Sequence, residues 1–223
     1  MDCVGLLAAS LKKLPVKKDE FYYSSLIKML ETHMPQVWRA YDQFISHALK
    51  KDEKKITCSK GCSACCSHYV DSVEPMELLA IHLRIRNWEG YPALLEAFHK
   101  RATRFQSLHA EEGGGEDAED RALFRYFRRG TPCPFLKTGG ECGIYEFRPM
   151  SCRMFFAESP PRYCAGSGIA TPWNKNFQVE LPDAAEWALS QCSALLKEME
   201  LPEGLFAGLL EVNALVGKWD GAG

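Results

Sequence analysis

Seven of the ten cysteines in this 223-residue chain fall into two compact blocks. The first reads CSKGCSACC over residues 58–66, and the second reads CPFLKTGGECGIYEFRPMSC over residues 133–152. On a helix, the four thiols of the first block would lie on neighbouring parts of one face. Gly61 argues against a regular helix, and a turn that leads into a helix would bring the thiols together equally well. Thiols gathered in this way favour a metal site.

A disulfide framework is the other common use of clustered cysteines. Secreted chains rich in disulfides are usually much shorter than this one. Residues 3–9 are apolar, but no basic region precedes them, and the run is about half as long as the apolar part of a signal peptide. We therefore expect a cytoplasmic protein with free thiols, and free clustered thiols favour metal. A disulfide between the neighbours Cys65 and Cys66 is the alternative.

The adjacent pair Cys65 and Cys66 bears on the number of metal atoms. Neighbouring side chains diverge by about 100° on a helix and by more on a strand, so both rarely reach one tetrahedral metal. We expect the two thiols to serve different metal atoms, in two sites or in one multinuclear cluster. With Cys164, eight sulfurs would complete two closed sites of four thiolates each. The predicted ligands are Cys58, Cys62, Cys65, Cys66, Cys133, Cys142, Cys152 and Cys164.

The two blocks together resemble the CxxCxxCC, or YkgJ-type, family of zinc- or iron-chelating proteins. The resemblance rests on CSKGCSACC followed by CPFL and then CGIYEFRPMSCR, and covers about residues 56–165. The first spacing has three residues instead of the two in the family's name. The resemblance implies that the seven cysteines of the blocks chelate Zn²⁺, Fe or an iron–sulfur cluster, while Cys164 is matched by position alone. Some lysine N-methylase-type proteins look similar.

Charged residues beside the second block are candidates to stabilise the thiolates. Zinc held by four thiolates has a formal charge of about −2, which needs compensation when it is buried. Arg148 and Arg153 are candidates to donate hydrogen bonds to the sulfurs, and Glu146 would orient one of them. A salt bridge between Glu146 and Arg148 that only pins the loop is the alternative.

Three other residues could bind metal but have simpler interpretations. His68 lies two positions beyond Cys66 and could be a ligand or carry a proton, although such a histidine is more often a neighbour without either role. Cys3 and Cys192 lie within apolar helical patterns, where a buried cysteine acts as a small hydrophobic residue. We expect both cysteines to pack in the core.

The elements that must position these residues are mostly helices. Apolar spacing predicts helices in the first fifty residues, with a boundary or kink at Pro35, a helix that begins near Pro75 and another that begins near Pro92. Two more helices are expected over residues 184–199 and from residue 205, with a short strand at 177–181 before them. Residues 111–120, EEGGGEDAED, are expected to form a mobile solvated loop.

Residues 130–176 are rich in glycine and proline, and we expect metal ligation to organise them. The predicted fold class is therefore mainly α, with a single helical domain around an irregular cysteine-rich metal-binding segment. Within residues 1–223, the N-terminal helices occupy 1–55, the cysteine-cluster core 56–165 and the C-terminal helices 183–217.

Composition limits the possible partners. A net charge of −2 with scattered Lys and Arg offers no surface for nucleic acid, and no apolar run approaches the ~20 residues of a membrane helix. The metal ion is the predicted partner, and a protein partner or small substrate is left open.

Two functions fit these observations. The first is a metal-binding protein whose zinc or iron is structural or is handled for other proteins. The alternative is an iron–sulfur redox enzyme or a methyl-transferring enzyme. The radical-enzyme spacing of Cys58, Cys62 and Cys65 is discounted, because Cys66 follows directly and no βαβ alternation appears.

Overall fold

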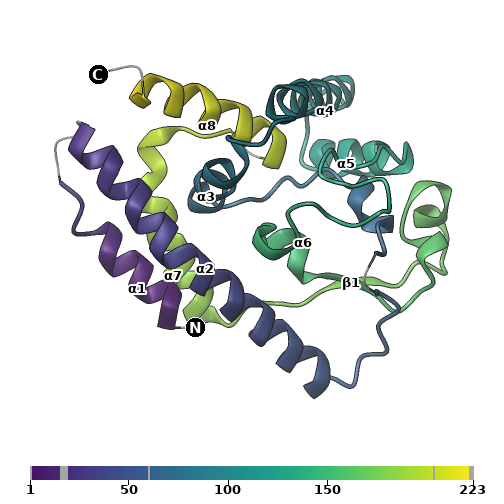
Figure 1. Ribbon diagram of the computed structural model, residues 1–223. Coiled ribbons are helices and arrows are strands. Elements are labelled where there is room, and N and C mark those ends of the chain that lie inside the picture. The colour runs from purple at the N-terminus through teal and green to yellow at the C-terminus, as the bar shows by residue number, and fades with distance from the viewer. Residues whose placement is uncertain (1, 16–19, 60, 203, 221–223) are drawn as a thin grey trace.

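The computed structural model describes residues 2–15, 20–59, 61–202 and 204–220, and it is mainly α-helical, as predicted (Figure 1). The α-helices are α1 (Asp2–Leu11), α2 (Glu20–Lys51), α3 (Pro75–Ile85), α4 (Tyr91–Glu111), α5 (Ala118–Arg128), α6 (Met150–Met154), α7 (Asp183–Leu196) and α8 (Leu205–Asp220). Short 3₁₀ helices are η1 (Ala64–Ser67), η2 (Tyr145–Phe147), η3 (Pro161–Tyr163), η4 (Gly166–Ala170) and η5 (Lys197–Met199). The strands are β1 (Phe155–Ala157) and β2 (Asn176–Gln178).

Helix α2 continues through Pro35, so of the two predictions for this residue, a boundary or a kink, the boundary is wrong. A proline inside a helix costs about 3 kcal/mol, because one hydrogen bond is lost and the ring clashes with the preceding turn. The helix buries Leu30, Met34, Val37 and Trp38 around that position. Each such side chain contributes about 1.5–3 kcal/mol, so together they outweigh the cost of the proline.

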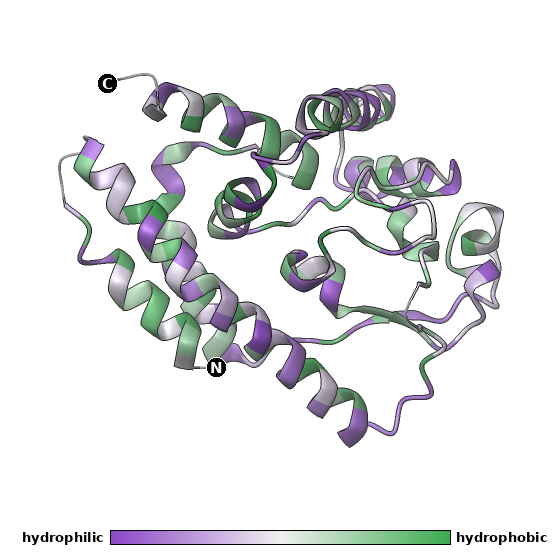
Figure 2. Ribbon diagram, in the orientation of Figure 1, coloured by the Kyte–Doolittle hydropathy of each residue, from purple (hydrophilic) through white to green (hydrophobic). Residues whose placement is uncertain are grey.

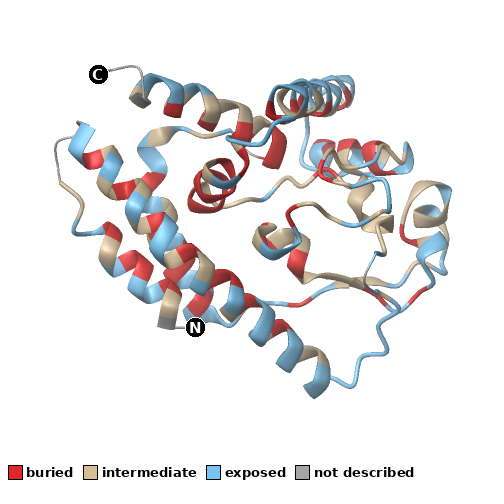
Figure 3. Ribbon diagram, in the orientation of Figure 1, coloured by how far each residue is buried: buried red, intermediate tan, exposed pale blue. Residues whose placement is uncertain are grey.

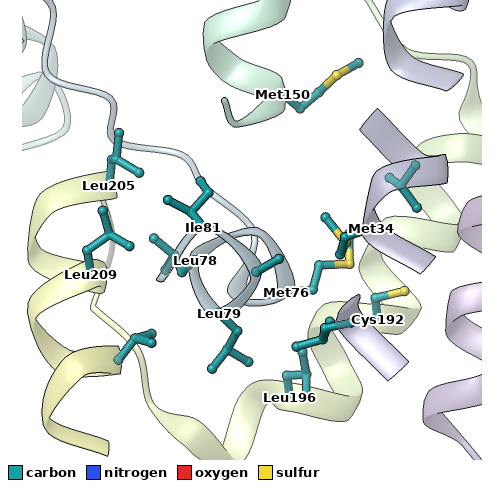
Figure 4. Packing of buried hydrophobic residues seen from close by; sticks show 14 of the residues in the cluster. Met34, Met76, Leu78, Leu79, Ile81, Met150, Cys192, Leu196, Leu205 and Leu209 are labelled. Carbon is teal, nitrogen blue, oxygen red and sulfur yellow. The ribbon is translucent and has the colours of Figure 1, made fainter. Parts of the chain in front are cut away.

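Helix α3 lies at the centre of the helical arrangement and is buried on nearly every side (Figure 3). In Figure 4 its Leu78 points toward Leu205 and Leu209 of α8, and its Met76 lies beside Met34 of α2. Pro75 is the first residue of this helix, as predicted. A proline lacks the N–H group, and at this position no hydrogen bond within the helix is lost, because the first N–H groups of a helix have no partner there. Because α3 is the first α-helix after the first cysteine block, its burial fixes the chain that leaves that block.

The other long helices bury one stripe and expose the other side. Hydrophobic and hydrophilic residues alternate along α2, α4 and α8 (Figure 2), and their buried positions recur about once a turn. In α4 the ring of Phe98 stacks on Phe206 of α8, with centroids 5.6 Å apart. Among the described residues, no helix combines the length and apolar character that crossing a membrane requires.

Helix α5 occupies part of the segment that was expected to be a loop. The connection between α4 and α5 is limited to residues 112–117, and Glu112 accepts hydrogen bonds from Arg121 and Arg125 at 2.8 and 2.7 Å. Burial of Ala118, Ala122 and Tyr126 holds α5 in place despite its many charges.

Strands β1 and β2 form an antiparallel pair in which Phe156 faces Phe177. The observed strand at 176–178 overlaps the predicted one at 177–181 but ends earlier. The strand pair joins the segment that follows the second cysteine block to the segment that leads into α7.

Of the two cysteines expected in the core, Cys192 is fully buried there, whereas Cys3 is half-buried and packs against the core. Trp187 and Leu195 of α7 are exposed hydrophobic residues.

Candidate metal centre

Seven predicted ligands line one cavity of about 360 Å³. They come from both blocks: Cys58, Cys62, Cys65, Cys66, Cys133, Cys142 and Cys152. The remaining walls include the aromatic side chains of Tyr69, Phe135, Phe155 and Phe156. The fold therefore brings together thiols that are about seventy residues apart in the chain.

The first block is a turn that leads into a short 3₁₀ helix, which is one of the two predicted geometries. Thr57 anchors its start, because the Thr57 amide donates to Ala157 O at 2.9 Å and its hydroxyl donates to Ser159 O at 2.6 Å. Gly61 has φ +84°, a conformation that favours glycine. The turn then enters η1, which contains Cys65 and Cys66.

A tight hairpin connects Cys133 to Cys142. Leu136 and Cys142 form an antiparallel bridge, and the Gly143 amide donates to Phe135 O at 2.7 Å. At the tip, Gly140 has φ +81°, and a Cβ there would lie 3.3 Å from the carbonyl oxygen of Gly61. The hairpin therefore packs its backbone against the first block.

Cys152 lies on α6, and Glu77 of α3 holds the start of that helix. The Glu77 carboxylate accepts a hydrogen bond from the Met150 amide at 2.9 Å. Glu77 is only 1% exposed, and this burial raises its pKa to about 7.

Arg153 is also buried, but it does not take the role predicted for it. Its guanidinium donates to the carbonyl oxygens of Arg148 at 2.9 Å and Glu146 at 2.5 Å, and it pairs with the Asp42 carboxylate of α2. These partners occupy the guanidinium, so Arg153 fixes the loop between Cys142 and Cys152. Glu146 contributes its backbone carbonyl to this arrangement.

Arg148 is a positively charged residue that faces the thiols. Its side chain lines the cavity and lies over the Tyr145 ring, 4.2 Å from the centroid. Its Nε is buried and has no hydrogen-bond partner among the described residues. Its positive charge favours the thiolate forms and so opposes the increase in the pKa of Cys65, Cys142 and Cys152.

The cavity thiols of Cys65, Cys133 and Cys152 resist ionisation in the absence of a metal cation. Burial raises the pKa of Cys133 to about 11 and also raises that of Cys152. A hydrogen bond with Cys66, together with burial, raises the pKa of Cys65. A metal cation provides the missing positive charge, and soft thiolates suit zinc and iron, so the donor set fits such a metal.

The thiols share a cavity but do not yet converge on one point. As placed, the side chains of residues 2–15, 20–59, 61–202 and 204–220 form no group of three or more His, Cys, Asp or Glu that could hold a metal ion. Ligation therefore requires side-chain rotation within the cavity.

Cys164 is the predicted ligand that lies outside the cavity wall. It is buried, and its thiol donates to Pro160 O at 3.8 Å. Burial raises the pKa of Cys164, and the thiols of Cys58 and Cys62 add to this increase.

His68 lines the cavity and packs against Phe127 and Phe155. Burial lowers its pKa to about 3, so its imidazole is neutral at physiological pH. Nε2 has no hydrogen-bond partner in the part of the chain that the structure describes. A neutral ring with a free nitrogen retains the capacity to bind metal.

Arg101 of α4 contacts the backbone beside both cysteine blocks and was not predicted. It donates to the carbonyl oxygen of His68 and to those of Thr131 and Pro132. The sequence contained one signal: Arg101 lies three positions after Phe98 and four before Phe105, on the buried stripe of the helix.

Comparisons with known proteins agree with the composition of this site. Searches of curated proteins and of solved structures find no match. A family model described as "CxxCxxCC: Putative zinc- or iron-chelating domain" matches residues 57–178, which is more than half of the chain. The matched range contains every predicted ligand and Arg101. The chain therefore belongs to the CxxCxxCC family, whose domain is described as chelating zinc or iron.

Proposed function

We propose that this protein binds zinc or iron through the thiolates of the cavity, in a centre of two or more metal atoms, and that it handles metal. The observation that carries the proposal is that seven cysteines from two distant blocks line one cavity. A single tetrahedral metal uses four ligands. Seven thiols in one place therefore favour more than one metal atom.

The adjacent residues Cys65 and Cys66 also favour more than one metal atom. Both line the cavity, and both lie on η1, where neighbouring side chains leave the backbone in different directions. We infer that they bind different metal atoms within one shared cavity, instead of completing two separate closed sites.

The shape of the site supports metal handling over a purely structural role. Structural zinc sites are closed by four protein ligands. A cavity of about 360 Å³ has a volume in the range of small-molecule sites, so the thiols have room to exchange their metal. The blocks are held in place by hydrogen bonds of Thr57, Glu77 and Arg153. None of these hydrogen bonds uses a thiol.

An iron–sulfur redox protein is the second candidate, and the apolar walls favour it. Phe135, Ile144 and Phe155 line the cavity beside the thiols. Iron–sulfur clusters are held by cysteine thiolates, and an apolar environment controls their potential and access to solvent.

One experiment tests the proposal and separates the two candidates. The full chain is purified without air, and its metal content, acid-labile sulfide and visible spectrum are measured. About two zinc atoms per chain in a colourless protein would support metal handling. A brown protein with iron and sulfide would support the redox candidate. A chain that retains neither metal, and takes up neither zinc nor iron when reduced, would overturn the proposal.

A further inference from the structure

Arg101 connects the backbone segments that flank the two cysteine blocks. One terminal nitrogen of its guanidinium, Nη1, donates to the carbonyl oxygens of Thr131 and Pro132, each at 2.6 Å. The other, Nη2, donates to His68 O at 2.8 Å. Pro132 immediately precedes Cys133, and His68 follows Cys66 by two residues. A single side chain therefore fixes the entry to the second block relative to the exit from the first.

The partners of Arg101 leave its positive charge without a neutralising carboxylate. The residue is only 4% exposed, and among the described residues it forms no ion pair. It also lies over the rings of Tyr126 and Phe206, with centroids 5.0 and 4.8 Å away. Burying a cation is costly, and neutral carbonyls and aromatic faces compensate it only partly.

The guanidinium lies beside both blocks. Its partners include the carbonyl oxygen of Pro132, which directly precedes Cys133, and that of His68, which follows Cys66 by two residues. A buried cation held by backbone carbonyls beside two thiols is suited to a site that becomes negatively charged when it binds metal.

We propose that Arg101 is a positioning residue of the metal centre, which holds the first and second cysteine blocks at a fixed separation and places a positive charge beside their thiolates. This inference rests on the proposed function, because it needs a metal centre formed by both blocks. Arg101 touches no metal itself, and it acts through Cys66 and Cys133.

Arg104 provides a matched control. It lies three positions further along α4 and donates to the hydroxyl of Thr131 at 3.1 Å, from an exposed position. It therefore contacts the same loop without reaching the first block. Replacing it by glutamine removes a positive charge from the same helix and leaves the connection between the blocks intact.

The test compares Arg101→Lys, Arg101→Gln and Arg104→Gln in the full chain. Each reduced protein is titrated with cadmium(II), the ultraviolet absorption of the cadmium–thiolate bonds is followed, and affinity is measured by competition with a chromophoric chelator. Helical circular dichroism is recorded for each protein. Residues that support metal ligands typically change affinity 10–100-fold. We expect Arg101→Gln to weaken binding by at least about tenfold, Arg101→Lys to restore part of it, and Arg104→Gln to match the original chain.

Each possible outcome supports or overturns the inference. Folded Arg101 variants that bind cadmium as tightly as Arg104→Gln would overturn it, while the proposed function would stand. Loss of the helical fold in both Arg101 variants would also overturn it, because the residue would then serve the core instead of the site. If the original chain binds neither cadmium nor zinc, the proposed function itself fails.

Discussion

The carbonyl oxygen of Gly61 lies 3.3 Å from the position that a Cβ on Gly140 would occupy. The two cysteine blocks therefore meet backbone to backbone at a point where neither residue has a side chain. Gly61 and Gly140 both adopt positive φ, which favours glycine, and at Gly140 a Cβ would also crowd the Gly61 carbonyl. This contact explains how thiols far apart in the sequence line one cavity.

Replacing a cavity cysteine should reduce the amount of metal bound. In Cys65→Ser the volume is nearly unchanged but the soft ligand is lost, so we expect fewer metal atoms per chain. Metal analysis of the purified variant measures this directly. Cys192→Ala is the control, because Cys192 is buried in the helical core and should not affect metal content. Equal losses in both variants would contradict the assignment.

Cys164 should differ from the cavity cysteines. Its thiol faces the carbonyl oxygen of Pro160 and does not line the cavity. We therefore expect Cys164→Ser to keep the full metal content, measured in the same way. A loss as large as that of Cys65→Ser would instead make Cys164 the eighth ligand.

Metal removal should loosen the hairpin between Cys133 and Cys142 before it loosens α6. Lys137 is exposed in that hairpin, whereas Arg153 is buried and bonded on α6. Because metal would join both ends of the hairpin to the first block, chelation should speed tryptic cleavage after Lys137 while cleavage after Arg153 stays slow. Mass spectrometry of timed digests measures both rates. Identical digestion with and without a chelator would show that metal does not organise this segment.

Glu77 should make the chain less stable as pH rises. Burial raises its pKa from an ordinary value of 4.5 to about 7, so the folded chain holds this proton more tightly than the unfolded chain does. The favourable contribution of Glu77 to the free energy of unfolding is complete below about pH 4.5 and is lost as pH rises through about 7. The loss is on the order of 3 kcal/mol.

Glu77→Gln should remove this pH dependence while keeping an acceptor for the Met150 amide. Urea unfolding of both proteins between about pH 4.5 and 8 gives the difference in unfolding free energy at each pH. The difference should shift in favour of the variant as pH rises. A constant difference would mean that Glu77 does not titrate in this range.

Replacing either of two glycines in α8 by alanine should change the stability of the fold, in opposite directions at the two positions. A Cβ on Gly208 would overlap the side chain of Leu78, so Gly208→Ala should destabilise the fold by about 1–3 kcal/mol. Gly217 has no atom near that position, and Gly217→Ala should stabilise the helix by up to about 1 kcal/mol. Thermal unfolding of both variants measures the two effects, and changes of the same sign would contradict the packing of α8 on α3.

The sequence predicted those features that local patterns determine. Apolar spacing identified the helices that begin near Pro75 and Pro92, and cysteine spacing identified the seven thiols of the cavity. The buried cluster includes residues from the N-terminal, cysteine-rich and C-terminal segments. From this shared core we propose that the three segments form the predicted single domain.

The features missed in the sequence depend on contacts between distant segments. Helix α2 crosses Pro35 because buried neighbours on other helices hold it, and α5 forms because four of its residues are buried. Arg101 has an ordinary place in a helical pattern, and its importance follows from carbonyl groups about thirty residues away. Tertiary packing overrides local preference at such positions.

The residues that the family model matches do not form a unit that could be transferred to another protein by themselves. Within the matched range, buried Arg153 pairs with Asp42 of α2, and Phe98 stacks on Phe206 of α8, yet both partners lie outside residues 57–178. A graft cut at those boundaries would carry an uncompensated buried cation and an uncovered aromatic ring. Transfer of the cysteine segment to another scaffold therefore requires that α2 and α8 be transferred as well.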